Sequence, residues 1–451
     1  MKKLLLSALL LSFYGVAQDT PTDDSFVSKA YNTSFFKTPP IRSFFGSTGV
    51  LDEQDFADAI VKDGKRTYSE GLEDIGIPEN NGIDPALQTA APIHKGNGET
   101  KVNVNGMGGA FPPDPTGAAG PNNYVQAVNS SFKILNKDGS NISGGVHQLS
   151  FLWPGSSSDG DPIVMYDRFA DRWFISQFQT ASSEILIAIS ETSDPMGAYF
   201  AYSFTVNSSS SFPDYPKFGL WPNGYYMSAN SGNSNCVVFE REEMLLGNPA
   251  QMITMTFPSM GYFFRSVAPA YAEGQTAPDA DEPFYYFHIQ DNSWSGVSTD
   301  HIKVLKCEVD WAAGNGSVSV HQSLNTESFN SVFTNSWDDL TQKGSGQKLD
   351  AVTGIIMYKA QYRRFADYNT AVMCTTVDVD NTNRAGIRWF ELRDNNDGQW
   401  YIYQEGTYSP DAQNSRWMGN VAMDQNGNIG LAYSFAGSDE YAGLRYTGRF
   451  K

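Results

Sequence analysis

From residue 114 onward the chain alternates short apolar runs with polar segments, and the runs recur in groups of four. In one group they cover residues 161–166, 172–176, 184–190 and 199–204, each of a length suited to a strand. The groups open at Asp114, Asp161, Asp214, Arg265, Asp350 and Arg416. The first four openings lie about 50 residues apart, and such a period built only of strands is typical of a β-propeller. We therefore predict an all-β propeller of about six four-stranded blades, with seven as the alternative because the fourth group is long.

The chain begins with a pattern typical of a secretory signal peptide. Met1, Lys2 and Lys3 precede an apolar run over residues 4–11, and the small residues Gly15 and Ala17 suit a signal-peptidase site. The apolar run is too short to span a bilayer as a mature helix. We expect residues 1–17 to be removed by cleavage after Ala17. The mature protein is then secreted or held at the cell surface, with no membrane span of its own.

The region between the signal peptide and the repeats differs in composition from the rest. Residues 18–105 are expected to form an acidic, extended arm, with one weak helical pattern inside the acidic stretch 52–79. The propeller is assigned to residues 106–451, and its last group shows only three clear strands. Residues 101–105 alternate like a strand, so we predict that they complete the final blade.

Charge and composition narrow the class of partner. A formal net charge of −19 argues against nucleic acid and against anionic membrane surfaces. Charged residues make up 18% and aromatic residues 14%, which is ample material for a folded core. We expect a monomer whose partner is a glycan, a peptide or another surface protein.

Three cysteines are few for an exported chain, so disulfides are not expected to be the main source of its stability. Cys236, Cys307 and Cys374 each fall inside a predicted strand. We expect buried thiols that pack as small apolar groups. If one bridge forms, Cys236 and Cys307 are the pair to test.

Several longer motifs extend over the repeats. They are GQKLD at 346–350, YRRF at 362–365, RWFELR at 388–393, QEGTYSPD at 404–411, RWM at 416–418 and RYTGR at 445–449, with DP at 161–162, YD at 166–167 and DRW at 171–173. Together they resemble an uncharacterised family of secreted bacterial β-propeller proteins, over roughly residues 107–450. The resemblance implies export and a propeller fold. It implies no established activity and no catalytic residues.

The residues that open the groups are the first candidates for a binding site. Loops that enter the inner strands of a propeller meet on one axial face, so these residues are expected to ring one mouth of the tunnel. The ring would contain Asp114, Asp161, Asp214, Arg265, Asp350 and Arg416. Such groups suit a divalent cation such as Ca²⁺, a sugar or a charged peptide end. The alternative is that each Asp caps its own turn and each Arg pairs with a neighbouring carboxylate.

Aromatic residues offer a second set of candidates. Trp294 and Trp337 lie in predicted loops, where an indole is free to stack on a ligand. The tryptophans inside predicted strands, including Trp173 and Trp389, are expected to pack between blades instead.

Catalytic chemistry has weaker support. The fold suggests a sialidase-like architecture, but the repeated Ser-x-Asp-x-Gly-x-Thr-Trp turn of sialidases is absent. A glycosidase needs two carboxylates about 5–10 Å apart, which any pair in the axial ring would satisfy, so no catalytic residue is assigned. The five histidines show no metal-ligand spacing, and no metal site is assigned.

These patterns lead to two functional hypotheses. The first is an exported binding propeller that recognises its partner through one axial face. The second is a polysaccharide-acting glycoside hydrolase or lyase that uses the axial carboxylates. A catalytic pair would include a partly buried carboxyl group with a raised pKa, whereas a binding ring would stay ionised.

Overall fold

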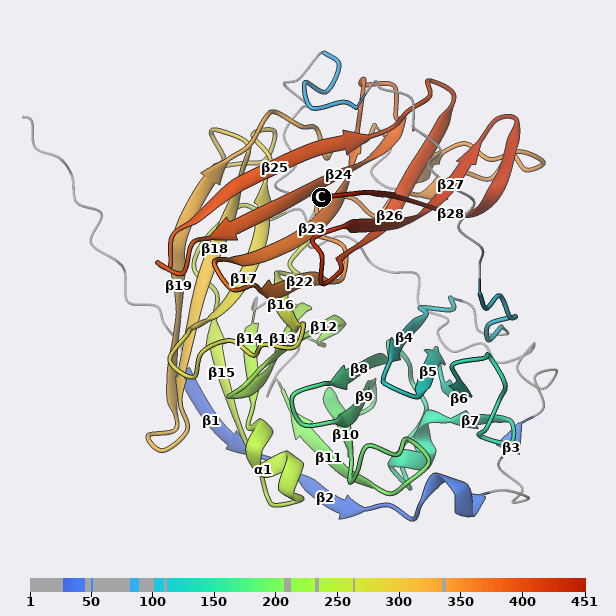
Figure 1. The fold of residues 1–451 in the computed structure, drawn as a ribbon, viewed down its shortest axis with the longest axis vertical. Helices are drawn as coiled ribbons and strands as arrows, with labels where there is room; N and C mark the ends of the chain where they lie inside the picture. The colour runs from blue at the N-terminus through green and yellow to red at the C-terminus, as the bar shows by residue number, and fades with distance from the viewer. Residues whose placement is uncertain are drawn as a thin grey trace, which may run out of the picture.

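The structure is a computed structural model that describes residues 27–44, 50–51, 82–88, 101–108, 112–206, 212–231, 235–262, 264–334 and 338–451. Its strands are grouped into blades around a central axis (Figure 1). The prediction of an all-β propeller is confirmed. The signal peptide and the acidic stretch 52–79 lie outside the described residues.

Five blades contain four antiparallel strands each, numbered outward from the axis, and the sixth contains three. Blade 1 is β4 (Thr116–Ala119), β5 (Asn123–Val128), β6 (Ser131–Asn136) and β7 (Val146–Gln148). Blade 2 is β8 (Ile163–Asp167), β9 (Arg172–Gln179), β10 (Glu184–Ser190) and β11 (Tyr199–Thr205). Blade 3 is β12 (Asp214–Trp221), β13 (Gly224–Asn230), β14 (Asn235–Phe239) and β15 (Gln251–Thr256).

The remaining blades follow the same order. Blade 4 is β16 (Ala268–Glu273), β17 (Phe284–Gln290), β18 (His301–Asp310) and β19 (Asn315–Asn325). Blade 5 is β22 (Ala360–Arg364), β23 (Asn369–Asp378), β24 (Ala385–Asp394) and β25 (Trp400–Tyr408). Blade 6 is β26 (Asn414–Met423), β27 (Ile429–Gly437) and β28 (Glu440–Arg449).

The long fourth group does not hold a seventh blade. Its extra residues extend the β18–β19 hairpin and form a two-stranded sheet of β20 (Asp338–Leu340) and β21 (Leu349–Asp350). Residues 352–358, which follow the predicted group opening at Asp350, are not a strand. The inner position of blade 5 is taken by β22, which pairs in parallel with β16 and joins blades 4 and 5 into one eight-stranded sheet.

Helices are few and short in the described ranges. They are the 3₁₀ turns η1 (Ile41–Phe44) and η4 (Leu149–Leu152) and the helix α1 (Arg241–Leu246). None of the described helices has the length and apolar character needed to cross a membrane.

The core lies between successive blades, which explains the apolar runs. Trp173 and Phe174 are neighbours on β9 and point to opposite faces of their blade. Trp173 packs in the cluster shared with blade 1, and Phe174 packs against Phe218 of blade 3 with ring centroids 5.0 Å apart. Because both faces of a middle blade are covered, its strands are apolar at consecutive positions and do not alternate.

The N-terminal arm adds a fifth, outermost strand to each of three blades. β1 (Val27–Tyr31) pairs with β15, β2 (Ser34–Lys37) with β11, and β3 (Val50–Leu51) with β7. Figure 1 shows these segments along the outer rim of the propeller. The arm passes blade 3 first and blade 1 last, which is the reverse of the order in which the blades follow one another in the sequence. Each of the three pairings supplies hydrogen-bond partners to a sheet edge that would otherwise be open.

Residues 101–105 do not complete the last blade. They form no strand, and the side chains of Val102 and Val104 lie beside Gly139 of blade 1. The neighbouring Met107 N–H donates to the Gln126 side chain on β5 at 3.2 Å. This segment therefore covers the face of blade 1, and β28 has no outer partner strand among the described residues.

A second part of the arm, residues 82–88, is anchored on blade 5 by a buried ion pair. Arg388 and Asp84 are 0% and 4% exposed, and the guanidinium donates to Asp84 Oδ1 at 3.0 Å. Arg388 also donates to Glu405 at 2.5 Å, while Thr407 donates its hydroxyl proton to Asp84 Oδ2 at 2.6 Å. Docking of the arm thus gives Arg388 a second carboxylate beside Glu405, and it gives the buried Asp84 its cation.

We expect Asp84→Ala to lower the free energy of unfolding by about 3 kcal/mol, because it removes one of the two carboxylates that pair with the buried Arg388 guanidinium. Urea denaturation would measure this loss. Glu191→Ala is the matched control, since Glu191 pairs with Lys37 of the arm at an exposed site. Water screens that pair, so its loss should cost less than about 1 kcal/mol. Equal effects of the two substitutions would contradict a special role for the buried pair.

The three cysteines are buried free thiols, as expected. Cys236 on β14 and Cys307 on β18 bring their Sγ atoms to 3.7 Å across the boundary between blades 3 and 4. Burial raises the pKa of Cys307, which disfavours the reactive thiolate.

We predict that a thiol reagent such as 5,5′-dithiobis(2-nitrobenzoate) modifies none of the three cysteines in the native protein. Burial opposes reaction at all three thiols, and the raised pKa values of Cys307 and Cys374 oppose it further. In denaturant without reductant the same titration should count three thiols. A count of one, with Cys374 as the reactive residue, would instead show that Cys236 and Cys307 had oxidised to a disulfide.

Candidate functional site

The openings of the first three blades are joined by hydrogen bonds. The Asp161 N–H donates to Asn129 Oδ1 at 2.7 Å, and its carboxylate accepts the Tyr215 N–H at 3.2 Å. Asn129 also donates to the Asp114 carboxylate at 2.6 Å. Asp114 and Asp161 adopt left-handed backbone angles, with φ of 34° and 44°, at a cost of about 1–3 kcal/mol each. These contacts give both carboxylates a structural role at the junction of the blades.

The other predicted ring members are placed differently. The Arg265 N–H donates to Asn230 of blade 3 at 3.2 Å, and Asp214 is the first residue of β12. Asp350 lies in the small β20–β21 sheet, and its carboxylate accepts the N–H of Val352 in its own turn at 2.7 Å.

Arg416 is not at the mouth of the tunnel. It is 3% exposed, it pairs with Asp411, and it lies between the rings of Tyr408 and Phe435. In the part of the chain that the structure describes, no three His, Cys, Asp or Glu side chains are placed to hold a metal ion.

Of the two tryptophans predicted to stack on a ligand, the one that the structure describes is not available for that role. Trp294 is 2% exposed and packs in the core beside His288, so it cannot stack on a ligand from outside. Its loop folds back through the Val297 N–H, which donates to the Trp294 carbonyl at 3.1 Å. Trp337 lies outside the described residues.

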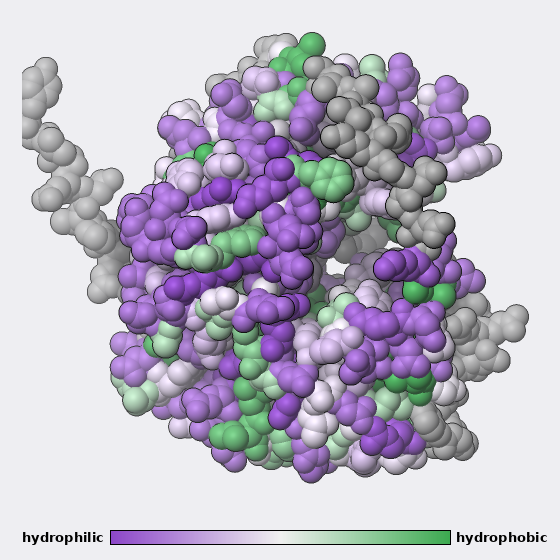
Figure 2. Space-filling model, viewed as in Figure 1, coloured by the Kyte–Doolittle hydropathy of each residue, from purple (hydrophilic) through white to green (hydrophobic). Residues whose placement is uncertain are grey.

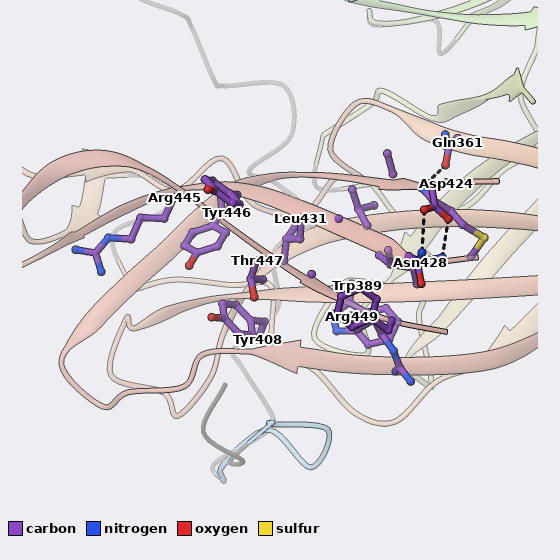
Figure 3. A pocket seen from close by; sticks show the side chains of 18 of the residues that line it. Gln361, Trp389, Tyr408, Asp424, Asn428, Leu431, Arg445, Tyr446, Thr447 and Arg449 are labelled. Atoms are coloured by element: carbon purple, nitrogen blue, oxygen red, sulfur yellow. Dashed lines mark hydrogen bonds between the residues drawn. The ribbon is translucent and has the colours of Figure 1, made fainter. Parts of the chain in front are cut away.

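A groove between blades 5 and 6 is the candidate site that the geometry presents. Its volume is about 1270 Å³. One wall comes from β24 and β25, the other from blade 6, and the inner end reaches β16 and β22 at the axis. Figure 3 shows the lining side chains, and Figure 2 shows that the face of the molecule viewed in Figure 1 is mostly hydrophilic. We call this space the inter-blade groove.

Aromatic side chains line the groove. Trp389 on β24 donates its indole N–H to Gln88 of the arm at 3.1 Å, which fixes the ring. The rings of Tyr408 and Tyr433 face each other across the two blades with centroids 5.7 Å apart. Tyr446 on the open strand β28 is 77% exposed at one end of the groove (Figure 3), and its register partner is Ala432, so its side chain leaves the strand on the face opposite to Arg445 and Arg449.

Two carboxyl groups lie at the axial end. Burial works to raise the pKa of Glu273, but Lys359 and Gln361, which both hydrogen-bond to it, lower that pKa below its usual value. Asp424 accepts the N–H groups of Asn426 and Asn428 at 2.8 and 2.9 Å. Hydrogen bonds from Asn428 lower the pKa of Asp424 as well. Both carboxyl groups are therefore ionised at neutral pH.

Guanidinium groups supply the positive charge of the groove. Arg445 and Arg449 pair in the strand register with Tyr433 and Ile429, so they share the face of blade 6 that packs toward blade 5. Arg449 lies over the Trp389 ring, 5.6 Å from its centroid. Arg363 projects from β22 at the axial end.

Carboxyl groups with raised pKa values occur away from this groove. Burial raises the pKa of Asp300 to about 6, and the group accepts the N–H groups of Asn292 and Phe329 at 2.6 and 2.9 Å. Burial also raises the pKa of Glu282 and of Asp378. None of the three carboxyl groups lines the groove.

We expect Asp300→Asn to change how stability depends on pH. With its pKa near 6, native Asp300 keeps its proton between about pH 4 and pH 6, where the unfolded chain releases it. This contribution to stability is present at low pH and is lost as pH rises through 6, on the order of 2–3 kcal/mol. Urea denaturation from pH 4 to 7 should therefore show a falling difference between wild type and variant. A flat difference between wild type and Asp300→Asn over this pH range would contradict the raised pKa.

Sequence reasoning missed the inter-blade groove because its residues come from separate groups of the chain. It correctly placed Trp389 in the core, at 6% exposure, but the edge of the same ring lines the groove. The available signal was the motif at 445–449, where arginine and tyrosine occur in a strand that no outer strand covers.

Comparison with solved structures finds proteins of different function at low similarity. The catalytic domain of an α-L-arabinofuranosidase from Coprinopsis cinerea has a TM-score of 0.33 and 10% identity, over 75% of this chain and 90% of that chain. An endo-arabinase from Bacteroides thetaiotaomicron has a TM-score of 0.32 and 11% identity, over 64% and 94%. The WD40 domain of SCAP from fission yeast has a TM-score of 0.33 and 8% identity, over 73% and 72%. No family model and no curated protein matches the chain, and these structures transfer no site residue to it.

Proposed function

We propose that this protein is an exported binding propeller that holds a glycan chain in the inter-blade groove. The observation that carries the proposal is the lining of the groove, in which aromatic rings alternate with hydrogen-bonding and charged side chains. Aromatic surface with a few polar groups is the usual composition of a site for an organic ligand. The volume of about 1270 Å³ is larger than one small molecule needs and suits several linked sugar units.

Binding fits the groove better than catalysis does. Hydrolysis of a glycosidic bond needs a carboxylic acid that is still protonated when it meets the leaving oxygen. Glu273 and Asp424 are the carboxyl groups of the groove, and the pKa of each is lowered. Glu273 is also occupied by Lys359 and Gln361. Neither is suited to act as the general acid.

Export rests on the N-terminal sequence pattern and on the resemblance to a secreted bacterial family. Both fit a role outside the cell, where polysaccharides are the abundant partners. The proposal moves the binding surface from the axial ring to the groove, because the contacts of Asp114, Asp161, Asp350 and Arg416 account for those residues structurally.

Tyr408→Ala should weaken glycan binding about fivefold to tenfold, since it removes a ring that lines the blade 5 wall of the groove. Native affinity gels that contain soluble polysaccharides, both neutral and acidic, would measure retardation of the folded protein. Tyr403→Ala is the matched control, because Tyr403 is 49% exposed on the same strand, β25, and does not line the groove. If no polysaccharide retards the wild type, or if both variants bind equally well, the proposed site is wrong.

A further inference from the structure

We propose that the inter-blade groove selects an acidic polysaccharide, whose sugar units carry carboxylate or sulfate groups. This inference rests on the proposed function and adds the chemical class of the ligand. It is carried by three arginines that come together from β22 and β28 in a chain whose formal net charge is −19.

The charges that line the groove do not cancel. Its ionisable groups other than tyrosine are two carboxylates and three guanidiniums, namely Glu273, Asp424, Arg363, Arg445 and Arg449. Glu273 is already neutralised by Lys359, which stands behind it. Asp424 and Glu440, which lies 3.5 Å from Arg445, offset two of the three guanidiniums, so the groove keeps a net positive charge in a chain that is acidic as a whole.

Arg363 is the cation at the axial end, and Glu273 and Asp424 act on it without forming an ion pair with it. No ion pair or side-chain hydrogen bond from it occurs among the described residues, and its buried Nε has no hydrogen-bond partner there. Its neighbour Arg168 is turned to the Gly274 carbonyl, to which it donates at 3.2 Å. Burial lowers the pKa of Arg363; Glu273 opposes this shift and Arg168 adds to it. An anionic ligand group would offset the free-energy cost of burying the Arg363 guanidinium, because a guanidinium binds carboxylate or sulfate through paired N–H donors.

The other two arginines indicate a polymer. Arg445 and Arg449 lie on one face of β28, four residues apart, which corresponds to about 13 Å along a strand. One sugar ring cannot reach both, whereas a chain laid along β28 can. Arg445 is already near Glu440 at 3.5 Å, but Arg449 has no carboxylate partner among the described residues and projects over Trp389. A sugar stacked at this indole would bring its acidic group to Arg449.

The test compares polymers that differ only in charge. Dextran sulfate is paired with dextran, and polygalacturonate with its methyl ester, in titration calorimetry with the full chain. We expect each acidic polymer to bind at least about tenfold more tightly than its neutral partner, and 0.5 M NaCl to remove most of that difference. Whichever acidic polymer binds more tightly identifies the acidic group.

Variants localise the effect. Arg449→Gln and Arg363→Gln should each weaken binding of the acidic polymer about fivefold to tenfold and leave binding of the neutral polymer unchanged. Arg42→Gln is the matched control: it removes the same charge from an exposed site on the arm, paired with Asp194. Circular dichroism and the melting temperature confirm that each variant is folded.

The outcomes separate this inference from the proposed function. Equal binding of charged and neutral polymers would overturn the acidic ligand and keep the glycan groove. Binding of no polymer would overturn the proposed function itself. If poly-glutamate binds as tightly as the acidic polysaccharides, the groove recognises negative charge and not the sugar, and the proposed polysaccharide ligand is wrong. An effect of Arg42→Gln equal to that of Arg449→Gln would place the interaction outside the groove.

Discussion

The outer strand of a propeller blade exposes a row of backbone N–H and C=O groups that need hydrogen-bond partners. In this molecule the architecture depends on which segments provide those partners. The N-terminal arm provides them to blades 3, 2 and 1 through β1, β2 and β3. A later part of the arm reaches blade 5, where Leu87 forms a bridge with Thr407 and Asp84 meets Arg388 in a buried pair. The arm is therefore a structural part of the propeller rather than a leader attached to it. Blade 6 receives no such strand from the described residues, so β28 keeps an open edge.

The site follows from that difference between blades. Since β28 has no outer neighbour among the described residues, Arg445 and Arg449 stay accessible beside the covered wall that Trp389 and Tyr408 form in blade 5. The wall itself is fixed from behind by Gln88 of the arm, which accepts the indole hydrogen of Trp389. The same segment thus stabilises blade 5 and orients the ring proposed to bind sugar.

The β-propeller fold does not by itself decide between an enzyme and a binding protein. The environment of individual carboxyl groups is more informative. Where burial raises a carboxyl pKa, as at Asp300, the group accepts backbone N–H bonds that hold a loop in place. Where carboxyl groups line the groove, cations and hydrogen bonds keep them ionised. This division of environments supports recognition of a charged ligand rather than acid catalysis.

The sequence by itself determined the propeller class, the four strands of blade 2 and the three-stranded last blade, because each blade is a local meander whose buried faces leave apolar runs at regular spacing. It also placed the cysteines correctly as buried thiols. Only the tertiary structure decided the positions of β22, β1, β2 and β3, since each depends on pairing with a strand distant in sequence. The same holds for Trp294, which a predicted loop left exposed and the fold buries. The groove could not be predicted from the sequence, because its charged and aromatic residues belong to separate blades and only packing brings them to one surface.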